Sequence, residues 1–301
     1  MNFKIGDEIE ENGKPKENKG HKLGIIIVII IALFCGITVF LISNAFFGKK
    51  EVKEEPEVSS PLSLTDENVQ ILYNYVTYGT NGKRNDKFIT ESNVNLSSFE
   101  NKERFYYALQ FAQVEDFTPT DKKDSQGRKI YNISSSKIKE YMQRFFGGAV
   151  TYSNNIVITY PFSFRINGQN VGIMTYSETT DGFDTVFDGL EEKEESDKII
   201  EPYYAELTAA FKEPDGSYRL EEKIVYADAQ KNGDIYTVFI YKDYAHTSLI
   251  ETRPNQTEEM IRQNPIDIKY YKEKASTITY IFKTNNSVLY FDNSTIKQKG
   301  D

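Results

Sequence analysis

Histidine and cysteine, which carry much of the nucleophilic and metal chemistry of proteins, are nearly absent from this 301-residue chain. His246 is the only imidazole after residue 47, and the single cysteine is Cys35. One imidazole without a thiol cannot form the usual zinc or copper site. Ser248 lies two residues from His246, outside the strand–turn–helix setting of a catalytic serine. The sequence therefore predicts a loop histidine after a strand, with no catalytic residue, no metal ligand and no cofactor.

Acidic side chains are densest in residues 181–197 (DGFDTVFDGLEEKEESD), where eight of seventeen are Asp or Glu. This many carboxylates could gather a calcium ion, which is bound by several oxygen ligands. The spacing of the acids and glycines does not follow the EF-hand loop, so we interpret the segment as a solvated, mobile charge run. Calcium binding stays open as an alternative, as does a hydrolase that uses two carboxylates.

Aromatic residues are the other excess, with 21 Tyr and 20 Phe but no Trp. Exposed tyrosines could stack on sugars or contact a partner protein. Most of the aromatics recur at the core-facing positions of predicted helices and strands, so packing is the preferred explanation for them. A phosphate-binding loop is not predicted, because the glycines of residues 145–148 (FFGG) end a helix instead of opening one.

The charge balance excludes one class of partner. The formal net charge is −9, and five Lys cancel five acidic residues within 1–22, so the excess negative charge belongs to residues 48–301. Binding to nucleic acid depends on basic patches that release counterions, so we expect no nucleic-acid partner. A large domain without disulfides, rich in Asn, Lys, Ile and Tyr, favours a bacterial protein from an AT-rich genome.

An uncharged apolar run over residues 23–47 (LGIIIVIIIALFCGITVFLISNAFF) is the strongest single signal in the chain. At about 1.5 Å per residue it forms a helix of roughly 37 Å, enough to cross a hydrocarbon core of about 30 Å. A core helix of a soluble protein would seldom be apolar on every face over such a length. The run therefore predicts one transmembrane helix.

This helix is predicted to be an uncleaved anchor. A signal peptide has a shorter apolar core that ends at small residues, and Phe34 occupies the position before Cys35 where a lipoprotein signal needs a small residue. Orientation follows from the flanking lysines, which are Lys14, Lys16, Lys19 and Lys22 before the helix and Lys49, Lys50 and Lys53 after it. The bias is small, but basic residues ahead of a first apolar segment favour a cytoplasmic N-terminus.

Composition divides the chain into five parts. We expect a disordered cytoplasmic tail over 1–22, the transmembrane helix over 23–47, and a charged, proline-containing stalk over 48–63. A single extracytoplasmic domain follows over 64–296, and residues 297–301 are predicted to be disordered.

The folded domain is predicted to begin with helices. Apolar residues at spacings of three and four predict a helix over 66–78, with Thr65 as its N-cap. A second helix is expected from Ser97, with Glu100 completing a capping box, and it carries aromatic residues up to Phe111. A third runs from Ser135 or Ser136 to Phe146 and ends at the glycine pair. Residues 121–129 are interpreted as a polar loop, and 257–263 as one further short helix.

After residue 148 the apolar period changes from near 3.6 to 2, which indicates strands. Alternating runs cover 160–166, 171–176, 205–211, 218–226, 235–241, 277–283 and 287–291. Asn-Gly, Asp-Gly and Asn-Asn pairs separate them at residues 167, 215, 232 and 285, and such pairs favour primed hairpin turns. Helices followed by hairpins predict an α+β fold, with about three helices packed on an antiparallel sheet.

These features predict a single-pass membrane protein of the bacterial cell envelope whose extracytoplasmic domain binds or scaffolds a partner protein. The layout is similar to that of several envelope accessory families, including inner-membrane assembly components of secretion and conjugation systems. Two alternatives stay open at this point. One is a transmembrane sensor that recruits a cytoplasmic protein through its tail, and the other is a cell-surface hydrolase that uses paired carboxylates.

Overall fold

The computed structural model describes residues 58–77, 86–148, 151–157, 164–166, 169–188, 198–285 and 288–298. The predicted tail, the predicted membrane helix and most of the predicted stalk lie outside these ranges. Within the described ranges, the helices are too short or too polar for any of them to cross a membrane. The compact unit that contains the described residues begins at Val58.

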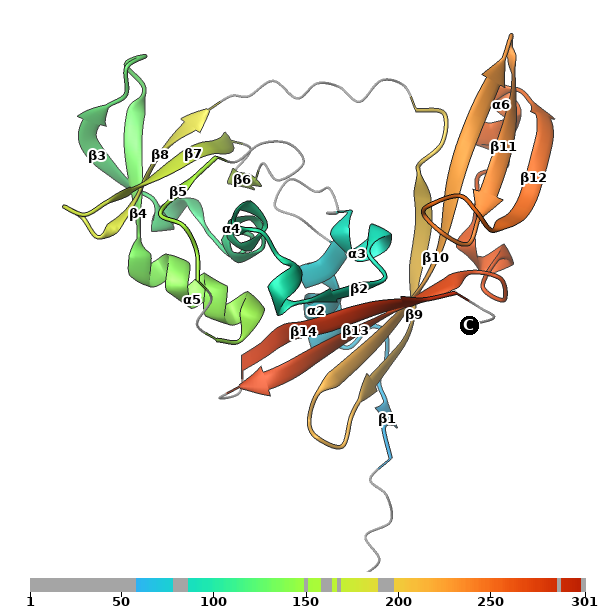
Figure 1. The fold of residues 1–301 in the computed structure, drawn as a ribbon, viewed down its shortest axis with the longest axis horizontal. Helices are drawn as coiled ribbons and strands as arrows, with labels where there is room; N and C mark the ends of the chain where they lie inside the picture. Colours follow the sequence, from blue (N-terminus) through green and yellow to red (C-terminus); the bar gives the residue numbers. More distant parts are fainter. Residues whose placement is uncertain are drawn as a thin grey trace, which may run out of the picture. The chain divides into compact units, whose positions relative to one another are not determined.

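In the described ranges, two antiparallel sheets and a few helices make up a mixed α+β fold, which confirms the predicted class (Figure 1). The α-helices are α2 (Glu67–Thr77), α3 (Lys87–Thr90), α4 (Asn101–Leu109), α5 (Ser135–Phe146) and α6 (Glu258–Gln263). The 3-10 turns are η1 (Leu96–Ser98), η2 (Val114–Asp116) and η3 (Ile268–Tyr270).

The larger sheet, sheet A, follows the order β1-β9-β10-β13-β14-β2, and β11 extends it from β10 to β12. Its strands are β1 (Ser60–Pro61), β2 (Asn93–Asn95), β9 (Tyr203–Lys212), β10 (Tyr218–Asn232), β11 (Ile235–Tyr241), β12 (Leu249–Gln256), β13 (Ser276–Asn285) and β14 (Val288–Lys297). Four of these, β9, β10, β11 and β13, contain the runs predicted from the alternation of apolar residues. In contrast, β1 lies in the segment predicted to be stalk.

The smaller sheet, sheet B, follows the order β3-β4-β8-β7-β5, with β6 paired to β7. Its strands are β3 (Thr118–Lys123), β4 (Lys129–Ser134), β5 (Asn155–Ile156), β6 (Phe164–Ile166), β7 (Gln169–Ser177) and β8 (Gly182–Asp188). Two sequence interpretations were wrong here. The polar loop is part of a hairpin, and the first part of the acidic run is β8, which pairs with β4 and β7 and buries Phe183 and Thr185 on its inner face.

The helices agree with the predicted positions, but two of the predicted caps do not. Asp66, not Thr65, accepts the backbone N–H groups of the first turn of α2, at 2.9 and 3.2 Å. The second helix starts later than predicted, because Glu100 is itself the N-cap of α4 and its partner in the capping box is Glu103. The limits of α5 are confirmed, with Ser134 as N-cap and Gly147 in the left-handed conformation at its end.

One predicted turn type was also wrong. Asp215 and Gly216 join β9 to β10, but only Gly216 has a positive φ, at 83°. The N–H of Gly216 bonds to the carbonyl of Glu213, and the N–H of Glu213 bonds to the carbonyl of Ser217. This pattern is a type I turn followed by a glycine bulge, which connects strands through three residues instead of two.

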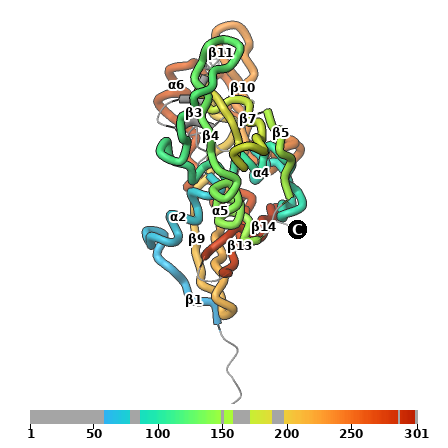
Figure 2. The backbone as a smooth tube through the Cα atoms, turned by 90° about the vertical axis from the view of Figure 1, so that its left-hand side faces the viewer, coloured from blue at the N-terminus to red at the C-terminus, as the bar shows by residue number. Residues whose placement is uncertain are grey.

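Strand β10 is the element that joins the two hydrophobic cores of the domain. Leu220, Ile224 and Tyr226 point into the first core, which also contains buried residues of α2, α3, α4, α5 and sheet B. Val225 and Ala227 point the other way, into a second core formed with β11, α6 and η3. Because side chains alternate along a strand, the two cores lie on opposite faces of β10. Figure 2 shows β1 at one end of the view and β11 at the other.

Candidate functional site

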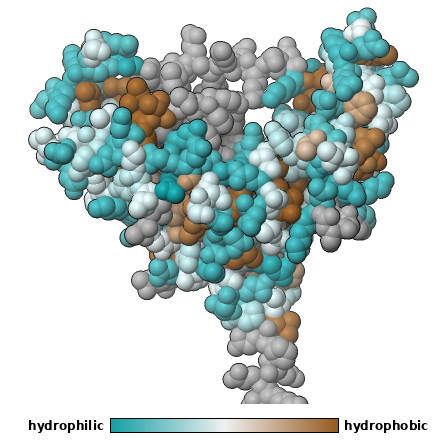
Figure 3. Space-filling model, in the orientation of Figure 1, coloured by the Kyte–Doolittle hydropathy of each residue, from teal (hydrophilic) through white to brown (hydrophobic). Residues whose placement is uncertain are grey.

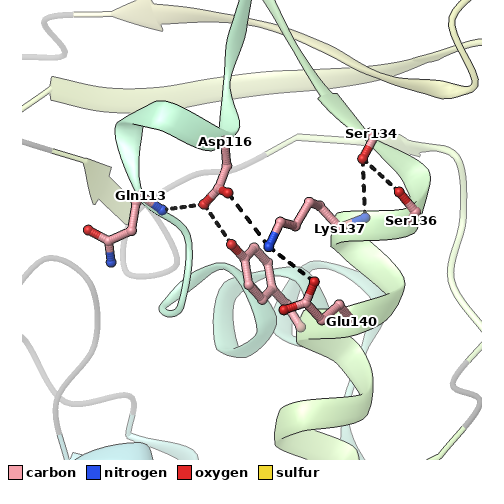
Figure 4. Close-up of polar contacts among 7 residues, drawn as sticks. Gln113, Asp116, Ser134, Ser136, Lys137 and Glu140 are labelled. Carbon is pink, nitrogen blue, oxygen red and sulfur yellow. Dashed lines mark hydrogen bonds and ion pairs between the residues drawn. The ribbon is translucent and has the colours of Figure 1, made fainter.

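Paired carboxylates are the arrangement that a hydrolase would need, and one such pair lies at the start of α5 (Figure 4). Asp116 accepts hydrogen bonds from the hydroxyl of Tyr141 at 2.6 Å and from the backbone N–H of Gln113 at 2.7 Å. The ammonium group of Lys137 lies between Asp116, at 3.8 Å, and Glu140, at 3.1 Å. Burial is the main cause that raises the pKa of Tyr141, and the hydrogen bond to Asp116 raises it further. These contacts tie η2 to α5, which is a structural role.

A second carboxylate pair surrounds Lys87 of α3. The Lys87 ammonium lies 2.7 Å from Glu91 and 3.3 Å from Glu103. Burial raises the pKa of Glu103, although the N–H of Glu100 and the charge of Lys87 act against this shift. A raised pKa is a property of many catalytic acids. Glu103, however, is also the capping-box residue of α4, with its carboxylate 2.7 Å from the N–H of Glu100. Its burial is therefore explained by packing.

The described part of the acidic run holds a turn and a strand. Asp181 has a left-handed φ of 43° and accepts a hydrogen bond from the hydroxyl of Tyr176 at 2.9 Å. Asp184 accepts one from the side-chain amide of Asn132 at 2.7 Å. Residues 189–197 lie outside the described part of the chain. Among the residues that are described, no group of three or more His, Cys, Asp or Glu side chains is placed to hold a metal ion.

Strands β10, β11 and β12 of sheet A carry an aromatic surface. It lies on the same face of the sheet as Tyr226, which packs into the first core. Register places Tyr241 opposite Tyr226 and Phe239 opposite Asp228, and opposite residues share one face of a sheet. Leu249 of β12 lies opposite Tyr241. We define the aromatic surface by these residues and the adjoining loop: Phe239, Tyr241, Tyr244, His246 and Leu249.

The rings of the aromatic surface stack on one another. The ring centroids of Tyr241 and His246 are 4.4 Å apart with planes 7° from parallel. Those of Tyr241 and Phe239 are 6.3 Å apart at 25°. Tyr244 contacts the buried Tyr226 ring edge-on, at 6.0 Å, and is itself 55% exposed. Leu249 is 54% exposed. Phe239 and Tyr241 are half-buried, whereas His246 in the loop is exposed.

The loop between β11 and β12 is held by one carboxylate. Asp243 accepts hydrogen bonds from the N–H of Thr247 at 3.0 Å and of Ser248 at 2.7 Å, and from the Thr247 hydroxyl at 3.1 Å. Burial would raise the pKa of Asp243, but these hydrogen bonds outweigh it and hold the pKa below its usual value. Asp243 thus fixes the path of the chain on both sides of His246.

His246, the residue singled out by the sequence, lies in this loop as predicted. Its φ is 58°, a conformation that a residue with a Cβ atom adopts only at a cost. Its ring packs on Tyr241, whereas Ser248 is bonded to Asp243 through its backbone. No hydrogen bond joins the side chains of His246 and Ser248 within the described structure. The pair therefore lacks the geometry of a nucleophile and its base.

The second core gives the aromatic surface a rigid support. The guanidinium of Arg253 on β12 donates to the Glu251 carboxylate at 3.0 Å, to the Tyr271 hydroxyl at 2.6 Å and to the carbonyl of Asn264 at 3.0 Å. The Tyr271 hydroxyl in turn donates to Glu251 at 2.7 Å. This network ties β12 to Asn264, which follows α6, and to Tyr271, which follows η3, behind the aromatic face.

Sequence reasoning missed this surface. The alternation over 235–241 predicted a strand but did not show which of its faces a core would cover. The one available signal was the cluster of Tyr241, Tyr244 and His246 at the strand end, where turns normally carry small polar residues.

Comparison of the chain with protein families, with curated proteins and with solved structures finds no match among any of them.

Proposed function

We propose that the chain is a single-pass, membrane-anchored protein of the bacterial cell envelope whose extracytoplasmic domain binds a partner protein through the aromatic surface. The observation that carries this proposal is the stacked set of rings, half-buried on β11 and exposed on its loop. Tyrosines held rigid by their neighbours supply large contact area at little cost in side-chain entropy, and they are enriched at the centres of protein interfaces.

The position of this surface along β10 supports the proposal. β1 joins the sheet beside Phe211 and Lys212, and Lys212 lies opposite Tyr218 at the start of β10. Tyr226 and Asp228, which border the aromatic surface, lie eight and ten residues further along the strand. At about 3.3 Å per residue, this separation is about 26–33 Å. A chain anchored through its N-terminal side would therefore hold the surface away from the point where the domain is tethered.

The described carboxylates favour binding over hydrolysis. Asp116 and Glu140 share one lysine, and so do Glu91 and Glu103. A glycosidase-type acid needs a carboxyl group that is free to give its proton to a substrate. Each pair is instead occupied by structural contacts within the domain.

Site-specific photo-crosslinking in intact cells tests this function. A photoreactive residue in place of Tyr244 should yield a discrete adduct with an envelope protein. The matched control is the same residue at Tyr270, which is 73% exposed on η3 outside the aromatic surface. The substitution Leu249→Glu should abolish the Tyr244 adduct without changing the melting temperature. Equal adducts at both positions, or none at either, would count against this function.

A further inference from the structure

Asp228 of β10 is the one charged side chain that the strands bring to the aromatic surface. Backbone register places Asp228 opposite Phe239 and Gln230 opposite Thr237, and Phe239 lies opposite Thr252 on its other side. Residues that are opposite in register share a face of the sheet, so beyond Tyr226 this face of the three strands carries one carboxylate and no Lys or Arg. Figure 3 shows hydrophobic residues among hydrophilic ones over β10, β11 and β12, on the right of the view.

The chain itself supplies no counterion for the Asp228 carboxylate. The side chain is half-buried, yet among the described residues it takes part in no hydrogen bond and no ion pair. In contrast, Asp243 of the neighbouring loop is bonded to Thr247 and Ser248. A half-buried carboxylate loses part of its hydration, and a cation that binds beside it offsets this loss. Asp228 is therefore suited to pair with a cation from outside the chain.

Elsewhere in sheet A the chain fills a similar arrangement with an arginine. Arg219 of β10 lies opposite Phe211 of β9, and its guanidinium group lies 4.0 Å from the centroid of the Phe211 ring. The Nε–H of Arg219 also donates to the Glu213 carboxylate at 2.6 Å. Ring, guanidinium group and carboxylate thus meet in one contact. At the aromatic surface the Phe239 ring and the Asp228 carboxylate come from opposite residues of neighbouring strands, and no guanidinium group of the described residues pairs with them.

We propose that the aromatic surface binds the side chain of an arginine, with Asp228 as its counterion. A planar guanidinium group can stack on an aromatic ring while it donates to a carboxylate, whereas an ammonium group is a compact and strongly hydrated charge. Contacts among the described residues follow this preference. Two guanidinium groups lie over rings at 4.0 and 4.2 Å from the centroids, and six ammonium groups lie at 4.8–5.9 Å.

This inference rests on the proposed function in one respect, because it takes the arginine to come from the partner protein. The formal net charge of the chain is −9, which favours the approach of a basic partner at longer range. Tyr244 packs on Tyr226, two residues from Asp228, and is 55% exposed. Its ring offers apolar contact to the methylene stem of the arginine.

Fluorine NMR of the full chain in detergent micelles tests the site without the partner. 3-Fluorotyrosine in place of Tyr244 reports on the surface, and the probe is N-acetyl-arginine amide. This probe should shift the fluorine resonance saturably at millimolar concentration. N-acetyl-citrulline amide, an uncharged isostere, should not shift it at the same ionic strength. Because this comparison needs no charge-changing substitution, it does not depend on the stability of a variant.

Substitution of the carboxylate makes the test specific. Asp228→Asn should weaken the affinity for the arginine probe roughly threefold or more. The matched control is Asp234→Asn, which removes the same charge from an exposed position in the turn between β10 and β11 and should leave the affinity unchanged. Equal shifts from the two probes, or an affinity that is the same in Asp228→Asn as in the wild type, would overturn the proposal.

Photo-crosslinking in cells then decides whether the partner supplies the arginine. Asp228→Lys puts a like charge beside the arginine, so it should reduce the Tyr244 adduct roughly fivefold or more, and Asp234→Lys should leave the adduct unchanged. An adduct that tolerates Asp228→Lys would overturn this inference while leaving the proposed function standing. Binding of the arginine probe without any adduct would instead contradict the proposed function and support the guanidinium site.

Discussion

The ring of Tyr290 on β14 occupies the space that a Cβ atom at Gly147 would need. Gly147 ends α5 with a φ of 75°, and its carbonyl accepts a hydrogen bond from the side-chain amide of Asn285 at 3.0 Å. The end of α5 is thus seated directly on sheet A. A glycine is required here for two separate reasons, its backbone conformation and the closeness of the ring.

Replacing this glycine should therefore destabilise the domain strongly. We expect Gly147→Ala to lower the free energy of unfolding by about 2–4 kcal/mol, from the left-handed backbone and the overlap with Tyr290 combined. Gly148→Ala is the control, because a Cβ atom there meets no atom within 4 Å. Urea unfolding of both variants measures the difference. Equal stability of the two would show that α5 does not end against Tyr290.

A buried carboxylate links α2 to sheet A. Glu222 of β10 is fully buried and accepts hydrogen bonds from the hydroxyls of Tyr73 at 2.5 Å and Tyr280 at 2.7 Å. Glu222→Leu removes both acceptors, so we expect a loss of about 2–4 kcal/mol in the free energy of unfolding. Glu221→Leu, at the half-buried neighbouring position, should cost much less. Chemical denaturation followed by circular dichroism compares the two variants.

Stability should depend on pH through Asp243. Its pKa is lowered in the folded state, so its stabilising contribution is present above the ordinary value of about 3.9 and is lost as the pH falls through the folded value. In Asp243→Asn, either orientation of the amide points its NH2 group at a backbone N–H. We expect this variant to melt below the wild type at pH 7, with the gap closing toward pH 3. A gap that stays constant with pH would contradict this role.

The proposed orientation of the chain in the membrane can be tested directly. Protease added to intact cells should remove a C-terminal epitope, because the proposed orientation places residues 64–296 outside the membrane. A tag fused to the N-terminus should survive until the cells are lysed. Survival of the C-terminal epitope would reverse the proposed orientation. Separately, deletion of residues 2–18 without a phenotype would argue against the sensor alternative.

Much of the local structure could be predicted because it is encoded by neighbouring residues. The limits of α5 follow from Ser134 or its neighbours at one end and Gly147 at the other, and the strand over 235–241 follows from its period of two. Thr257 was included in the last predicted helix and proves to be its N-cap. These signals act over a few residues, so a single sequence contains them.

The remaining features depend on residues that are far apart in the chain. Residues 182–188 were interpreted as part of a solvated acidic run, yet β4 and β7 enclose them as β8. The pairing of β1 with β9 joins residues 60 and 212, and nothing in either segment specifies the other. Such contacts form only if the whole topology forms, so local periodicity does not predict them.

The sequence by itself predicts a membrane segment over residues 23–47, and it determined that the domain is α+β and that metal or thiol chemistry has few residues to work with. Those conclusions follow from composition and from short-range spacing, which every copy of the chain carries regardless of its fold. Only the tertiary structure decided which faces are covered. Side chains alternate between the two faces along the whole of β10, but the first core covers this face only as far as Tyr226 and leaves the aromatic surface beyond it partly exposed. Burial is a property of the neighbours that a face meets, and those neighbours come from distant parts of the chain.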